Sequence, residues 1–286
     1  MSLPVACLRL LRVSPVLAHL DEGRALLDNA ACRRHIETVA SADHFFYLSH
    51  RHYLAQGLSR SQRTELACGH YEHEVSAYDD AYFDAVYRNG GLSLWRRTVG
   101  GTEFDVVIVP AMDVLCEGGL SVVLRVDGGR VGVVSFSHAD RTIVFDRETE
   151  SGSTLFLCRK QLAANHSWQV PFNAAFDRCS AAHFLTAAIA GIALAHGYDS
   201  VAGVRPDVQA SCTEDKQDQF QYSYGAFWES LGGRVRGRFA YEVPVPVQMT
   251  PLSELSAKRR HRARRRRDHI TEVREAARAV IERHRV

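Results

Sequence analysis

Histidine, cysteine and glutamate, the usual side-chain ligands of a transition metal, gather between residues 50 and 74. The candidates are His50, His52, Cys68, His70, His73 and Glu74. On a helix, two ligands face one another only when they are three or four residues apart. Only the pairs His70–His73 and His70–Glu74 meet that spacing, and no further group of paired ligands accompanies them. The sequence therefore predicts no metal site.

Glu117 is the best-placed carboxylate for proton transfer. It stands directly before Gly118, between two segments with strand character. In that position a carboxylate can serve as a general base, or it can simply be a polar residue of a hairpin. A serine hydrolase is not indicated, because the sequence contains no Gly-x-Ser-x-Gly motif.

Three other side chains have two interpretations each. His138 lies at the end of a predicted strand, where an imidazole can be catalytic or simply exposed. Gln161 can contact a ligand or satisfy backbone groups near a loop. Trp228, beside Phe227, can form a platform for a ligand or pack a helix onto a sheet.

Lys258 to Arg267 is a strongly basic segment. Its eight cations are Lys258, Arg259, Arg260, Arg262, Arg264, Arg265, Arg266 and Arg267. Without them the formal charge is 27 minus 33, or −6, so the basic character is local. Such clustering indicates either a solvated helix face or a polyanionic partner, such as an anionic membrane surface or the acidic helix of an acyl carrier protein. Nucleic acid is not favoured, because no aromatic platform accompanies the arginines.

The elements that must position these residues are clearest between Ser153 and Pro244. The pattern predicts strands at 154–158, 200–204 and 236–243, a long helix at 181–196 and a short helix at 224–231. The long helix is apolar nearly all round, which is typical of a buried helix. Ser180 can cap its first turn, and Gly197 can close it. In such α/β units a ligand usually binds where a strand feeds a helix N-terminus.

The remaining sequence predicts helices followed by an antiparallel meander. Aromatic residues at helical spacing favour helices within residues 15–90. Strands are predicted at 104–109, 120–126, 131–136 and 142–146, with a hairpin turn at Asp127-Gly128-Gly129. A helix with an apolar stripe follows Ser256. We expect an α+β fold with a helical N-terminal layer (1–100), a core with a mainly antiparallel mixed sheet and packed helices (101–250) and a basic C-terminal helix (251–286).

Composition indicates a globular chain with ample core, 46% hydrophobic and 24% charged. The sequence has no run of about 18 apolar residues that would predict a transmembrane helix. Arg9 and Arg12 interrupt the apolar start, so it predicts no secretory signal. The seven cysteines are scattered and form no CxxC, which fits reduced thiols. We expect a cytoplasmic protein, or one peripheral to the inner membrane.

Several short motifs resemble the bacterial VirK/YbjX family, in the same order along residues 44–270. They are His70-Tyr71, Glu117-Gly118, Gln161, Phe227-Trp228-Glu229-Ser230-Leu231-Gly232-Gly233 and the basic stretch from Lys258. After Gln161 the chain departs from the family pattern, which has a glycine, a Thr-Lys or Thr-Arg pair and a Gly-Leu-Arg-Pro step. The family is linked to virulence and to surface stress, and the resemblance implies no settled reaction.

Residues 153–244 also resemble the C-terminal half of GCN5-related N-acyltransferases. In those enzymes a splayed strand holds the pantetheine arm of the donor, a helix N-terminus holds its pyrophosphate, and a later helix ends in aromatic-x-x-x-Gly. The chain departs from them in one respect, because their phosphate loop is rich in glycine and residues 159–180 contain none.

This second resemblance implies a role for each candidate residue. Glu117 would be the base, and Thr154 to Cys158 the splayed strand. The tyrosine that protonates the departing thiolate falls at Trp228, so Tyr224, one turn earlier, takes that role. The donor phosphates would meet Arg159, Lys160, Asn173 and Arg178, and Gln161 would also contact the donor. The acceptor would meet His70, His138 and Trp228.

Two functions follow from these features. The first is an acyltransferase that moves an acyl group from coenzyme A or an acyl carrier protein to an amine or hydroxyl, without a permanently bound cofactor. The second is a non-catalytic virulence or envelope-stress protein that binds an anionic surface or a partner protein through its basic C-terminal helix.

Overall fold

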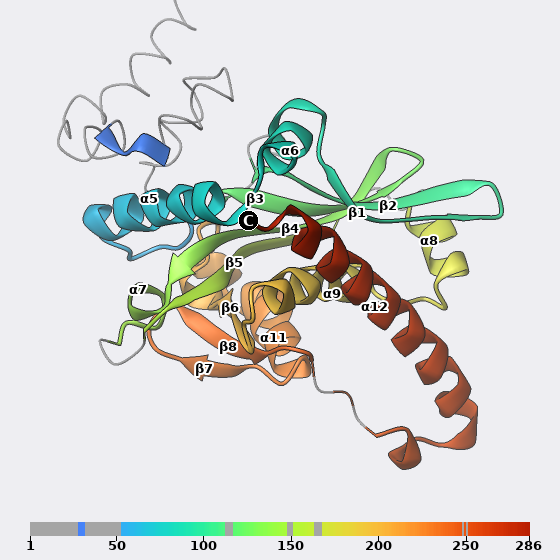
Figure 1. The fold of residues 1–286 in the computed structure, drawn as a ribbon. Helices are drawn as coiled ribbons and strands as arrows, with labels where there is room; N and C mark the ends of the chain where they lie inside the picture. Colours follow the sequence, from blue (N-terminus) through green and yellow to red (C-terminus); the bar gives the residue numbers. More distant parts are fainter. Residues whose placement is uncertain are drawn as a thin grey trace, which may run out of the picture.

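The protein was analysed as a computed structural model, which describes residues 28–31, 53–111, 117–147, 151–162, 168–247, 249 and 251–286. These residues form an α+β fold around a mostly antiparallel eight-stranded sheet (Figure 1). The strand order in the sheet is β1-β2-β3-β4-β5-β6-β8-β7. No helix in the described ranges has the length and apolar character needed to cross a membrane.

The first five strands form the meander. They are β1 (Leu92–Val99), β2 (Thr102–Pro110), β3 (Leu120–Val126), β4 (Gly129–Asp140) and β5 (Ser153–Leu162). Asp127 and Gly128 have φ of 45° and 77°, which a tight hairpin turn needs, so the predicted turn joins β3 and β4. The sheet begins with β1, inside the segment expected to be part of the helical layer.

The last three strands complete the sheet beyond β5. They are β6 (Ser200–Val204), β7 (Arg234–Arg236) and β8 (Ala240–Pro244). β6 runs parallel to β5 and antiparallel to β8. The single strand predicted at 236–243 is wrong, because Gly237 at φ 69° turns the chain and divides it into a hairpin of β7 and β8.

Two long helices lie side by side against the sheet (Figure 1). α9 (Ala181–Ala195) connects β5 to β6 and is buried nearly all round, as its apolar sequence predicts. α12 (Ala257–His284) packs on α9 and β1. Its apolar stripe includes Val273, Ala277 and Ile281, which are fully buried. The stripe therefore packs inside the fold and is not available to a partner protein.

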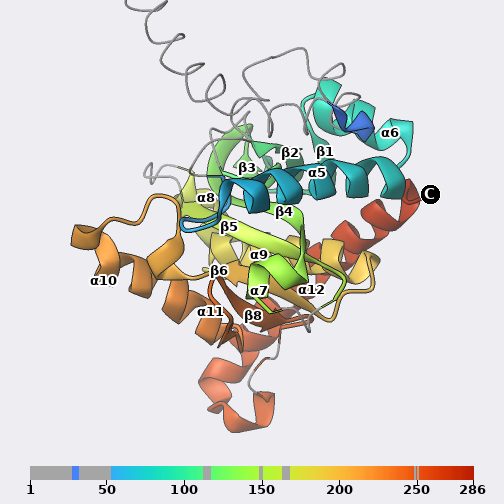
Figure 2. The ribbon, with the colours of Figure 1, turned by 90° about the vertical axis from the view of Figure 1, so that its left-hand side faces the viewer.

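α5 (Arg60–Ala77) lies along β4 (Figure 2). Its first turn has a capping box formed by Ser59 and Gln62, which satisfies amide groups that a helix start leaves open. β3 pairs with β4 only as far as Phe136, and α5 packs on β4 beyond that point. α6 (Asp80–Phe83) and a π-helical turn (Asp84–Arg88) lead from α5 to β1.

The other helices are short. They are α7 (Arg141–Phe145), α8 (Gln169–Ala175), α10 (Gln217–Phe220), a π-helical turn (Gln221–Gly225) and α11 (Ala226–Ser230). A strand predicted at 142–146 is wrong. Asp140 accepts a hydrogen bond from the Thr142 amide and starts a helix there, and Asp146 in the left-handed region ends it.

The two predicted caps of α9 differ in outcome. Gly197 follows the helix with φ of 75°, as expected. Ser180 stands at the N-cap position but makes no side-chain capping bond, so it leaves the first-turn amides to other partners. The helices predicted before residue 53 fall mostly outside the described residues, as do His50 and His52.

Candidate functional site

β5 separates from β6 soon after the two strands meet. They pair in parallel at Phe156↔Ala202 and Leu157↔Gly203. A bulge follows at Cys158, because β4 pairs Phe136 with Leu157 and then Ser135 with Arg159. β5 continues to Leu162, whereas β6 ends at Val204. Within the described residues, the end of β5 therefore has a strand partner on one side alone.

The Tyr224 phenol occupies the open side of β5. The Lys160 backbone N–H donates to the phenol oxygen (3.1 Å), and the phenol O–H is 3.2 Å from the Lys160 carbonyl oxygen. Burial raises the pKa of Tyr224, so the phenol stays protonated at neutral pH. The strand edge thus presents both a donor and an acceptor, and one hydroxyl satisfies both.

Trp228 holds the Tyr224 segment on the sheet. Its ring packs on Gly203, where an added Cβ would lie 2.6 Å from the indole, and its N–H donates to the Val204 carbonyl (3.0 Å). The side chain is 1% exposed. The Trp228 side chain therefore lies in the core between α11, to which it belongs, and β6. Of its two interpretations, these contacts match the packing of a helix onto a sheet.

Glu117 lies beside the bulge with both carboxylate oxygens engaged. Arg159 Nη1 is 2.7 Å from Oε2, and the Ser211 hydroxyl donates to Oε1 (3.1 Å). Arg159 also donates to the Gln161 side-chain oxygen (3.0 Å). Side chains alternate along a strand, so Arg159 and Gln161 extend towards Glu117 while Lys160 extends to the other face. Arg159 and Gln161 therefore lie on the same side of the strand as Glu117. Neither side chain lines the pocket at the start of α9 that is described next.

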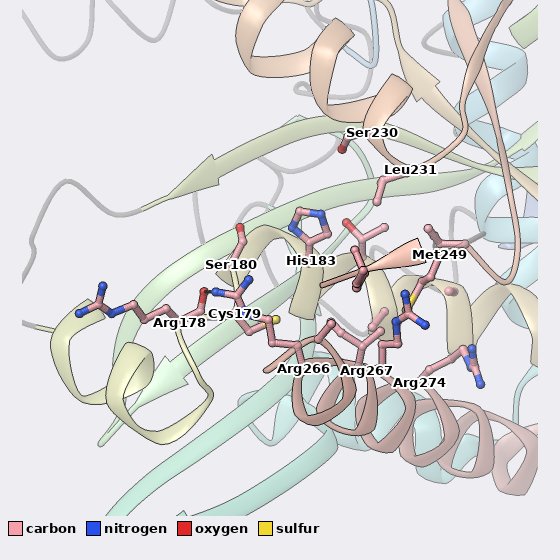
Figure 3. A pocket seen from close by; sticks show the side chains of 17 residues that line it. Arg178, Cys179, Ser180, His183, Ser230, Leu231, Met249, Arg266, Arg267 and Arg274 are labelled. Atoms are coloured by element: carbon pink, nitrogen blue, oxygen red, sulfur yellow. Dashed lines mark hydrogen bonds between the residues drawn. The ribbon is translucent and has the colours of Figure 1, made fainter. Parts of the chain in front are cut away.

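A pocket of about 520 Å³ opens where α9 begins (Figure 3). It lies between the first turns of α9, residues 263–274 of α12 and the end of α11. Its cationic side chains are Arg178, Arg266, Arg267 and Arg274, with His183 beside them. Figure 3 shows the α12 arginines next to the first turns of α9. A helix N-terminus among arginines is a favourable place for phosphate groups.

The basic stretch of α12 also secures the turn before α9. Arg266 donates to the carbonyl oxygens of Asp177 (2.9 Å) and Arg178 (2.8 Å), and Arg265 pairs with the Asp177 carboxylate (2.9 Å). Asp177 and Arg178 both have φ near 55°, an uncommon conformation for residues other than glycine. Two arginines of the predicted polyanion-binding stretch therefore bind the turn at Asp177 and Arg178 of the same chain. The sequence of the basic stretch alone did not predict this contact.

The pocket and the open strand edge are joined through Phe227. The His183 ring centre is 5.4 Å from that of Phe227, and Lys160 Nζ lies 4.6 Å from the Phe227 ring centre. Burial lowers the pKa of Lys160. Burial, and then the charges of Lys160 and Arg266, lower the pKa of His183. An anion in the pocket would relieve this crowding of cationic groups.

Asn173 does not join the pocket. Its side chain is exposed on α8, and its backbone carbonyl accepts a hydrogen bond from the Arg178 amide (2.8 Å). Of the five residues expected to bind the donor, Arg178 lines the pocket and Lys160 lies beside it. The sequence-based set missed His183, Arg266 and Arg267, because α9 and α12 are far apart in the chain.

His70 and His138 lie in a buried polar cluster between α5 and β4. The His138 backbone N–H donates to His70 Nδ1 (3.2 Å), so the His70 proton resides on Nε2, which faces the Glu74 carboxylate (3.4 Å). Tyr82 and Tyr87 also donate to Glu74 (2.9 and 2.6 Å). Burial raises the pKa of Glu74 to about 7. The His138–His70 bond holds α5 on β4, and the two tyrosines hold α6 and the turn after it on α5.

His73 and His196 gather around the His138 ring. The ring centres of His73 and His138 are 3.8 Å apart, and His196 is 4.8 Å from His73 and 5.1 Å from His138. His196 directly follows α9. Sequence spacing paired His73 with His70 of its own helix alone, whereas the fold brings it to β4 and α9.

Taken together, the fold and pocket define an α+β protein with an opened parallel strand pair beside a cationic cavity. The chain belongs to the family described as "Protein of unknown function (DUF535)", whose model matches residues 13–144 and 181–279. The unmatched residues between these ranges include the segment after Gln161 where the chain departs from the VirK/YbjX pattern.

A relative in Escherichia coli strain K12 supports the VirK/YbjX resemblance. This chain is 24% identical over 227 residues to the uncharacterized protein YbjX. The match covers 76% of this chain and 66%, just under two thirds, of YbjX. No solved structure matches the chain.

Proposed function

We propose that the protein is an acyltransferase of GCN5-related N-acyltransferase type. It would transfer an acyl group from an acyl thioester of coenzyme A or an acyl carrier protein to an amine or hydroxyl. The single observation that carries the proposal is the opened strand edge of β5, where the Tyr224 hydroxyl occupies the free backbone groups of Lys160. A pantetheine arm has amide groups that pair with such an edge.

The cationic pocket supports the same donor. It lies at the start of α9, the long helix between β5 and β6, and Lys160, His183 and Phe227 connect it to the strand edge. A donor whose phosphates lie among the arginines would run from α9 towards Tyr224. The acidic helix of an acyl carrier protein would meet the same arginines at the pocket mouth.

The chemistry needs two proton transfers, one on each side of the thioester. Glu117 would take a proton from the acceptor amine or hydroxyl, which then attacks the thioester carbonyl carbon. The C–S bond breaks, and the departing thiolate takes the Tyr224 proton. Arg159 and Ser211 engage both Glu117 oxygens, so a lone pair becomes available when the acceptor, or a water, replaces one of these contacts.

In the first experiment, ligands are titrated into the full chain, and their binding is measured by calorimetry and by the shift in thermal unfolding. The ligands are coenzyme A, acetyl-coenzyme A, a long-chain acyl-coenzyme A and acetyl-pantetheine, which lacks the phosphates. A ligand at 100 times its Kd stabilises the native state by about 2.7 kcal/mol. We expect the coenzyme A compounds to bind and acetyl-pantetheine to bind at least tenfold more weakly. Absence of binding by all of them would favour a carrier-protein donor or the non-catalytic function.

Replacing Tyr224 by phenylalanine is expected to separate donor binding from turnover. The change removes one hydroxyl, which leaves the Lys160 backbone groups for the donor but provides no proton for the thiolate. We expect kcat to fall by about 100-fold or more, in the range of general acid catalysis, with donor affinity kept or improved. Thiol release from acyl-coenzyme A measures the rate. Full activity in Tyr224→Phe would exclude the assigned proton donor.

A further inference from the structure

Three histidines from distant parts of the chain converge at one point. His73 comes from α5, His138 from β4, and His196 from the end of α9. One ring nitrogen of each lies within 4.8 Å of those of the other two. Among the described residues, no other group of three or more histidine, cysteine, aspartate or glutamate side chains has its ligand atoms close enough together to share a metal ion.

The ring nitrogens of this cluster lack the partners that buried polar atoms normally have. His138 is 1% exposed, and neither of its ring nitrogens has a hydrogen-bond partner within the described part of the chain. His73 Nε2 is likewise buried without one. An unpaired buried polar group is costly, and nearly all such groups in folded proteins are satisfied. A bound group that accepts electron pairs would satisfy one nitrogen of each ring, the nitrogen that carries the lone pair.

The protonation states suit a cation. Burial, and then the nearby Arg285 charge, lower the pKa of His73 to about 4, and burial lowers that of His196 to about 3. Burial also lowers the pKa of His138. At neutral pH each imidazole is therefore uncharged, with one lone pair available, as a metal ligand requires.

We propose that His73, His138 and His196 bind a divalent transition metal ion, with Zn²⁺ the best fit. Neutral imidazoles are ligands for zinc, and three histidines with an open fourth position are a known arrangement for it. Three nitrogens at 2.0–2.1 Å from one ion lie about 3.3 Å apart. The rings, at present partly stacked, would turn inwards on binding.

The surroundings provide a second layer of contacts. The Tyr78 hydroxyl lies 2.7 Å from His196 Nε2, so it either orients that ring or stands next to the fourth position. Glu74, one residue after His73, brings a carboxylate to the neighbouring His70. Arg285, which donates to the Ala195 carbonyl, is the cation that opposes the ion. His73 and His196 are half-buried, which leaves an approach from solvent.

The site is independent of the proposed acyl transfer. It shares no residue with the cationic pocket or with Glu117 and Tyr224. The metal proposal therefore stands or fails on metal binding alone, whatever becomes of the acyltransferase proposal.

The test uses the tag-free full chain, stripped with a chelator and titrated with Zn²⁺ and with Co²⁺. Metal content is measured by mass spectrometry, affinity by calorimetry, and coordination by the visible spectrum of bound Co²⁺. The variants are His73→Asn and His196→Asn, whose half-buried positions tolerate change better than that of His138. The matched control is His183→Asn, a half-buried histidine on α9 outside the cluster.

We expect one ion per chain, a rise in melting temperature with Zn²⁺, and a Co²⁺ spectrum typical of four-coordination. Each cluster variant should weaken Zn²⁺ binding on the order of 100-fold while circular dichroism shows an intact fold. His183→Asn should bind the ion as the original chain does. The proposal is overturned if the original chain binds no ion above the level of the His73→Asn His196→Asn double variant. Equal losses in the control and the cluster variants would also overturn it.

Discussion

Replacing Gly191 by alanine is expected to destabilise the protein by about 3 kcal/mol, although alanine is the better helix former. Gly191 lies in α9 at its crossing with α12. A Cβ there would be 2.3 Å from the Arg274 carbonyl oxygen and 2.9 Å from the Ala277 Cβ. The oxygen belongs to backbone inside a helix and cannot rotate away, so α12 as a whole must shift. Such a shift would also move the arginines that line the pocket.

Gly69→Ala is the matched control for this change. Gly69 is an exposed residue of α5, and a Cβ there would meet nothing within 4 Å. The same substitution should therefore stabilise by about 0.5–1 kcal/mol, through helix propensity alone. Urea-induced unfolding followed by circular dichroism measures both. If the two variants changed the free energy of unfolding in the same direction, the close contact between α9 and α12 would be refuted.

Replacing Arg178 and Arg267 together by serine is expected to weaken coenzyme A binding by about 100-fold. This prediction rests on the proposed function. Both side chains line the pocket at the start of α9. A hydrogen bond to a charged group contributes about 1.5–3 kcal/mol, and partial exposure reduces that figure. Arg266 is left in place, because it holds the turn before α9 through the Asp177 and Arg178 carbonyl oxygens.

The control removes the same charge from the outer face of α12. Arg259 and Arg264 are exposed and line no part of the pocket. Arg259→Ser with Arg264→Ser should change the affinity for coenzyme A less than threefold at moderate salt, because neither side chain lines the pocket and salt screens exposed charges. Calorimetry on both double variants decides the matter. Equal weakening in both would mean that the overall charge of α12, rather than the pocket, attracts the donor.

The local sequence pattern was enough to predict those helices and turns that are determined by the residues within them. The apolar α9, the hairpin at Asp127-Gly128 and the amphipathic α12 all form as expected, because periodicity and turn residues act over a few positions. The same reasoning misread residues 142–146. There β-branched residues favour a strand, but the Asp140 side chain caps the first turn of a helix.

The candidate site was predicted in part, and the limits have a physical cause. Lys160 lies within β5, Arg178 just before α9 and Tyr224 just before α11, so the local pattern that predicts these elements also places the three residues. By contrast, the partners of Glu117, and the arginines of α12 at the pocket, come from segments that meet only in the folded chain. Spacing along one helix could not reveal the histidine cluster either, because each ring belongs to a different element.

The late position of α12 in the sequence has a consequence for the nascent chain. One face of α9, including the surface at Gly191, packs against α12, and His284 at the end of α12 comes 89 positions after Ala195 (284 minus 195). At about 5–20 residues per second, the ribosome needs roughly 5–18 s to make that stretch. During this time α9 has been made and α12, which packs against it, is incomplete. We therefore expect α9 to be a chaperone-binding segment during synthesis, and chains truncated before Ala257 to aggregate.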